Sequence, residues 1–187
     1  MLSGTEGGRT SPELDADVEI AAALWRITGE PGEAVPVLAR VLAKAGPQWM
    51  RRTLGRAARA AAGIGAPARP LVPALEGLLA GRAPVPAVLL ALHAIAPDCL
   101  DAPRAAGLLL DAVERDDDTG TALEALAALG PAVVGEDGRR RLTALAERDL
   151  RVCTSGLQGG LVPGDERLRE RIRETVRRLS TDRPAYA

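Results

Sequence analysis

The stretch Ala122-Leu123-Glu124-Ala125-Leu126-Ala127-Ala128-Leu129-Gly130-Pro131 indicates the fold most directly, because an apolar helix stops there at a glycine and a proline. Glycine ends helices by adopting a left-handed conformation, and proline cannot continue them. Related phrases end near Ile27, Ile64 and Ile95. These residues and Leu129 lie 37, 31 and 34 positions apart. A repeat of this length predicts stacked pairs of antiparallel helices.

The composition points to a folded, all-α protein. Hydrophobic residues make up 47% of the 187 residues, yet Phe is absent and only Trp25, Trp49 and Tyr186 are aromatic. A core with so few rings requires close contact between helices, which alanine permits. No run of alternating strand-forming residues occurs, so we expect no sheet.

The pattern divides the chain into a tail, an array of about five helix pairs and a second tail. The tails are residues 1–12 and 181–187, and the array is residues 13–180. We expect the pairs at residues 14–45, 48–81, 84–115, 117–148 and 149–180. The fifth pair is irregular, because Gly156, Gly159 and Gly160 interrupt it.

Individual residues predict the helix ends and the core. Asp101 is expected to cap the helix that follows it. In the first helix, the apolar stripe of Ile20, Ala23, Leu24 and Ile27 is expected to face the core. In the last helix, the corresponding stripe is Leu168, Ile172, Val176 and Leu179.

Charge and cysteine content predict a cytoplasmic protein. The formal net charge is −1, and no apolar run has the roughly 18 residues that span a bilayer. The amino-terminal residues carry no apolar signal core. Cys99 and Cys153 match no disulfide or metal spacing, so we expect two reduced, largely buried thiols.

The sequence gives little support to catalysis. His93 is the only histidine, so neither a catalytic triad nor a histidine metal site is expected. Asp116, Asp117 and Asp118 suit a helix amino terminus better than a metal, because calcium-loop spacing is absent. We therefore expect no enzyme activity, no cofactor and no metal.

Three segments resemble HEAT repeats: residues 22–31, residues 67–75 and the stretch quoted first. The likeness is strongest to the Ala/Arg-rich, HEAT-like repeats of GC-rich bacteria that are grouped with phycobilisome-lyase-type repeats. It covers residues 14 to about 148 well. The resemblance implies a right-handed, armadillo-like α-α superhelix in which second helices line a concave, protein-binding surface. Lyase-like and glycosylase-like members of this class are the enzymatic alternatives.

Charged positions on the predicted second helices are therefore candidate contacts for a protein partner. They are Glu33, Arg40, Lys44, Glu76, Arg104, Asp111, Arg139, Arg140, Arg141 and Arg148. The alternative is nucleic-acid binding by the basic carboxy-terminal units, since residues 136–187 carry 12 basic and 9 acidic side chains. Acidic residues alternate with the arginines in this segment, which favours neutralised ion pairs over a free basic surface.

Two further surfaces are weaker candidates. Arg51, Arg52, Arg56 and Arg59 form a basic line, for which a solvated outer face is the simpler interpretation. The amino-terminal edge of the array is rich in Ala and Leu rather than polar. Because repeat arrays need polar ends, we expect a second copy or further repeats to cover it.

Overall fold

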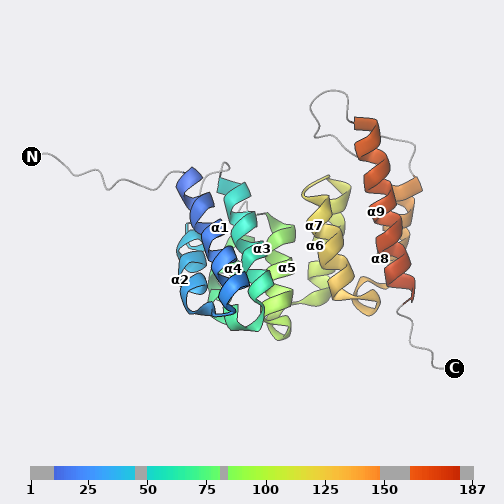
Figure 1. The fold of residues 1–187 in the computed structure, drawn as a ribbon. Coiled ribbons are helices and arrows are strands. Elements are labelled where there is room, and N and C mark those ends of the chain that lie inside the picture. The colour runs from blue at the N-terminus through green and yellow to red at the C-terminus, as the bar shows by residue number, and fades with distance from the viewer. Residues whose placement is uncertain (1–10, 45–49, 81–83, 148–160, 182–187) are drawn as a thin grey trace, which may run out of the picture.

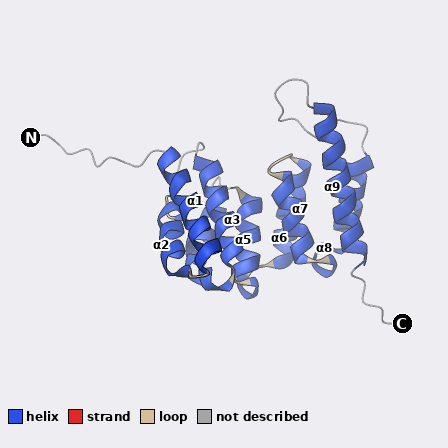
Figure 2. Cartoon of the chain, viewed as in Figure 1, coloured by secondary structure: helices blue, strands red, loops and turns tan. Residues whose placement is uncertain are grey.

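The computed structural model describes residues 11–44, 50–80, 84–147 and 161–181, and every regular element in these ranges is a helix (Figures 1 and 2). This confirms the all-α prediction for the described residues. The elements are α1 (Ser11–Thr28), α2 (Pro31–Leu42), α3 (Arg51–Ile64), η2 (Ala66–Leu71), α4 (Val72–Leu79), α5 (Val85–Ile95), η3 (Pro97–Cys99), α6 (Ala102–Glu114), α7 (Thr119–Leu129), α8 (Pro131–Glu147) and α9 (Leu161–Thr181). The elements η2 and η3 are short 3-10 helices.

The helices lie in two rows (Figure 1). In the first row, α1 packs on α3, α3 on α5, α5 on α7, and α7 on α9. In the second row, α2 packs on α4, and α6 packs on α8. Each helix of the second row also packs on the first-row helix that follows it in the chain. Along the chain the described helices follow one another as α1–α2, α3–α4, α5–α6 and α7–α8, four chain pairs followed by α9. In the second of these, α3 and α4 both pack on η2, which joins them.

Glycines make the turns within three of these pairs. Gly29, Gly65 and Gly130 follow α1, α3 and α7, with φ angles of 67°, 72° and 82°. A proline starts or nearly starts the next element in each case. The third pair turns differently, because Ala96 has a φ of −149° ahead of Pro97. The predicted turn positions are therefore confirmed, including the one without glycine.

The core consists of two apolar clusters that meet at α5. Pro86 through Leu92 are all buried. Ala87, Val88, Ala91 and Leu92 belong to the cluster formed with α1 to α4, whereas Leu89 and Leu90 belong to the cluster formed with α6 to α9. A helix that is apolar all round is expected at such a central place.

The structure corrects the prediction for the first helix. Leu14, Val18 and Ala21 are the buried residues of α1. Ile20 and Ile27, which were expected in the core, are 58% and 82% exposed. The helix has apolar residues on two faces, and the sequence pattern alone did not distinguish the packed face from the open one.

Several other predictions also need correction or fall outside the description. Cys99 is exposed rather than buried. Helix α1 begins at Ser11, inside the predicted tail. A break that the sequence pattern did not predict interrupts α8 at Gly135, where φ is 67° and ψ is 179°. Trp49, Arg148, Cys153 and the glycines of the irregular fifth unit lie outside the described residues.

The predicted cap of α6 is confirmed. The Asp101 side chain accepts a hydrogen bond from the Arg104 backbone N–H at 3.1 Å. We expect Asp101→Ala to lower the free energy of unfolding by about 1 kcal/mol, measured by urea denaturation. The matched control is Glu30→Ala at the amino terminus of α2, where no side-chain cap bond forms. Equal losses for both variants would contradict the capping role of Asp101.

Candidate functional site

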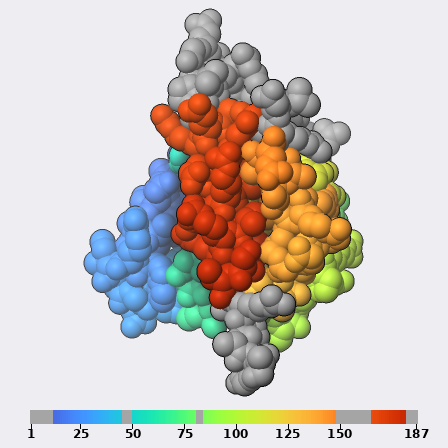
Figure 3. Space-filling model, turned by 90° about the vertical axis from the view of Figure 1, so that its right-hand side faces the viewer, coloured from blue at the N-terminus to red at the C-terminus, as the bar shows by residue number. Residues whose placement is uncertain are grey.

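A groove lies between α8 and α9, the two helices at the end of the molecule farthest from α1 (Figures 1 and 3). It has a volume of about 790 Å³. Its α8 wall includes Glu136, Arg139, Arg140, Thr143 and Glu147, positions that repeat every three or four residues and therefore share one helix face.

Helix α9 forms the opposite wall, and a second hollow extends the groove along it. Val176, Leu179 and Ser180 line the main groove. Thr143, Glu147 and Val176 line both hollows, which makes them continuous. Val176 is half-buried and Leu179 is buried, so the floor is apolar. An apolar floor between charged rims suits an amphipathic helix of a partner protein.

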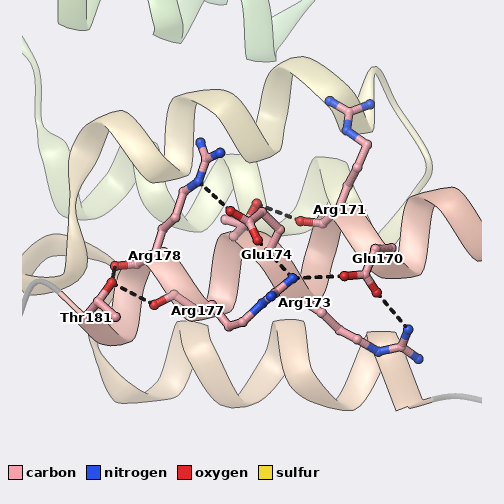
Figure 4. A network of polar contacts seen from close by, with 8 residues as sticks. Glu170, Arg171, Arg173, Glu174, Arg177, Arg178 and Thr181 are labelled. Carbon is pink, nitrogen blue, oxygen red and sulfur yellow. Dashed lines mark hydrogen bonds and ion pairs between the residues drawn. The ribbon is translucent and has the colours of Figure 1, made fainter.

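Ion pairs neutralise the arginines on the rim. On α8, Arg139 pairs with Glu136, and Arg140 pairs with Asp137 at 3.2 Å. On α9, Glu170 accepts from Arg173 at 3.4 Å and from Arg177 at 2.9 Å (Figure 4). The two hollows together are lined by four arginines and three glutamates.

A second network on α9 continues this pattern toward its carboxy-terminal end. Glu174 accepts from Arg177 at 2.9 Å and from Arg178 at 3.1 Å. Figure 4 shows that Arg171 points away from this network, toward α7. Its guanidinium donates to the Gly120 carbonyl at 3.3 Å. Exposed ion pairs such as these each contribute only tenths of a kcal/mol to the free energy of unfolding. They orient the side chains on the rim of the groove and have little effect on stability.

Arg141 lies on α8 next to the groove-lining arginines, but it has a different role. Its guanidinium donates to Glu114 at 2.9 Å and to Asp111 at 2.8 Å, which ties α8 to α6. The hydrogen bonds that Arg141 donates to the Glu114 and Asp111 carboxylates raise the pKa of Arg141 above its ordinary value. Arg141 and Asp111, both predicted as partner contacts, are thus placed together in a structural bridge.

The remaining predicted contacts on the second row do not join this groove. Glu33, Arg40 and Lys44 are exposed on or just after α2, Glu76 is exposed on α4, and Arg104 is exposed on α6. They belong to three different helices. Their role in binding remains a prediction.

The basic line on α3 is also largely neutralised. Arg51 pairs with Asp117 at 2.6 Å, and Arg56 lies 3.5 Å from Glu19. Arg59 donates to Thr121 at 2.6 Å and pairs with Glu124 at 3.2 Å. Arg52 is exposed. Arg51 and Arg59 of α3 thus contact residues on or next to α7, namely Asp117, Thr121 and Glu124. Because these side chains reach across α5, helix α5 lies farther from the surface than α3 and α7.

The α9 wall of the groove was not anticipated from the sequence. The spacing of Glu170, Arg173 and Arg177 puts them on one face, but charged faces are ordinary on solvated helices. Only the packing of α9 against α8 gives this face a neighbour. By contrast, Arg139 and Arg140 were predicted as contacts and do line the groove.

Comparisons with protein families, with curated proteins and with solved structures find no match for this chain. Within the described ranges, no helix is long and apolar enough to cross a membrane. The same ranges hold no group of three or more His, Cys, Asp or Glu side chains arranged to hold a metal ion.

Proposed function

We propose that this protein is a non-enzymatic binding module that recognises a protein partner through the groove between α8 and α9. The observation that carries the proposal is an apolar floor flanked by paired charges of both signs. The groove also lies where the second row would continue, because α2, α6 and α8 each pack on the first-row helix that precedes them, and α8 also packs on α6 of its own row. An incoming amphipathic helix would take the place of the next second-row helix.

The same proposal includes the finer fold. We infer a HEAT-like, right-handed α-solenoid of about five helix pairs, a scaffold whose second helices carry further partner contacts. The two rows of helices and the repeated glycine–proline turns support it. Stacked repeats bury a continuous core, and the curvature of the stack creates an extended concave surface that these proteins use for binding.

Charge favours a protein over nucleic acid as the partner. Binding to a phosphate backbone requires arginines that are available to replace counterions. Here Arg139, Arg140, Arg173 and Arg177 each have a carboxylate within 3.4 Å. The alternative of nucleic-acid binding by the carboxy-terminal units therefore has less support, and it becomes an outcome of the test.

The test is a pull-down from native lysate with Ala144→Arg, in nuclease-treated and untreated samples. Ala144 is exposed and lines the groove, so a long charged side chain blocks the groove without filling the core. The control is Ala43→Arg, which adds the same charge at an exposed position at the end of α2. We expect a nuclease-resistant protein to be recovered by the wild type and by the control, and to be lost with Ala144→Arg.

Two results would contradict this function. Recovery that disappears after nuclease treatment would favour nucleic acid. Equal recovery by Ala144→Arg and Ala43→Arg would place the binding surface elsewhere.

Arg140→Glu provides a milder variant, because Arg140 is 70% exposed on the rim. Arg141 is unsuitable for charge reversal, since its bridge to α6 would be broken.

A further inference from the structure

Helix α1 has two apolar faces, of which one is open. Leu14, Val18 and Ala21 face the core. On the opposite side of the helix, Ala16, Ile20, Ala23 and Ile27 recur at intervals of four, three and four residues and form a second stripe. Ile20 and Ile27 are the large apolar side chains that the described residues leave exposed.

The position of this stripe in the array indicates what kind of surface it is. Helices α3, α5 and α7 each pack on a first-row helix at both sides. Among the helices that the structure describes, α1 packs on a first-row neighbour at one side, which is α3. Its open stripe therefore occupies the place at which the first row would continue. A partner that supplies another helix of the same kind would extend the packing already present.

We propose that a second copy of this chain covers the stripe, with the two α1 helices antiparallel about a two-fold axis. Glu19 and Arg26 lie seven residues apart on the same flank of the stripe, and both are exposed; the Glu19 carboxylate also lies 3.5 Å from Arg56 of α3 within the same copy. A two-fold axis near Ala23 places Glu19 of each copy beside Arg26 of the other. The resulting interface is self-complementary, as two-fold contacts require.

The side chains fit a close crossing of two helices. Ala23 lies at the centre of the stripe, where a small side chain lets the backbones approach. Ile20 and Ile27 then pack on either side of the crossing, and the two symmetric ion pairs lie along one flank of the contact. Helix α1 and the groove between α8 and α9 lie at opposite ends of the molecule (Figure 1), so this inference is independent of the proposed partner site.

The test is sedimentation velocity of the full chain across a concentration series. We expect a reversible dimer for the wild type. Ile20→Lys and Ile27→Lys should each raise the dimer dissociation constant at least about tenfold. Both sites are exposed, so the monomer should remain folded, which circular dichroism checks. The control, Ala128→Lys on exposed α7 surface, should dimerise like the wild type.

A charge swap tests the two-fold geometry itself. Glu19→Arg alone and Arg26→Glu alone should each weaken the dimer, because like charges then meet across the axis. The double variant should recover dimerisation. A monomeric wild type, open-ended polymers, a dimer that survives Ile20→Lys and Ile27→Lys, or a double variant no better than the single ones would each overturn the proposal.

Discussion

Ile172→Ala is expected to lower the free energy of unfolding by about 3 kcal/mol, the largest single loss that we predict for this protein. Ile172 is fully buried on α9, in the cluster shared with α6, α7 and α8. Removing its branched side chain leaves a cavity that the close-packed helices cannot fill. For a chain of this size the midpoint of thermal unfolding should fall by roughly 6–12 °C.

The control for this variant is Arg173→Ala, one residue along the same helix. Arg173 is 54% exposed and contributes a surface ion pair, so its loss should change stability by less than about 0.5 kcal/mol. Urea denaturation followed by circular dichroism measures both variants. If Ile172→Ala unfolded like the wild type, the docking of α9 on α7 and α8 would be wrong.

Gly135→Ala is expected to cost about 1–3 kcal/mol, although the substitution removes no contact. Gly135 has a φ of 67° and a ψ of 179°, a conformation that only glycine adopts readily. A Cβ atom built there meets nothing within 4 Å, so the cost is backbone strain rather than a clash. Strain at this point would also shift the α8 wall of the groove, because the break at Gly135 sets the direction of the helix that follows.

The matched control makes the same substitution inside a helix. Gly107 lies within α6, and its added Cβ also meets nothing within 4 Å. Because alanine is the better helix former, Gly107→Ala should stabilise the protein by about 0.5–1 kcal/mol. The two variants should therefore shift the urea midpoint in opposite directions. Shifts of the same sign would show that Gly135 does not hold the strained conformation.

Local chemistry explains which parts of the fold could be predicted from the sequence. Gly29, Gly65 and Gly130 end helices through their own backbone freedom, and Asp101 caps through its own side chain. Ile172 and Leu179 lie in a stripe with only one apolar side, so their burial follows from spacing. Each of these features depends on a few adjacent residues, which the sequence displays directly.

The features that could not be predicted from the sequence depend on contacts between residues that lie far apart in the chain. Helix α1 carries apolar residues on two sides, and only the position of α2 and α3 decides which side is buried. The groove needs the α8 face with Arg139 and Arg140 to lie beside the α9 face with Val176. No spacing along the chain reports that proximity. Arg51 and Asp117, separated by 66 positions, are a further example.

The most direct test of the central claim is site-specific photocrosslinking in native cells from a photoreactive residue at position 144. If the groove between α8 and α9 binds a protein, position 144 should yield a defined protein adduct that the same residue at position 43 does not. Mass spectrometry of that adduct would identify the partner and its contacting segment, which should be an amphipathic helix. Identical adducts from positions 144 and 43, or an adduct only with nucleic acid, would contradict the account.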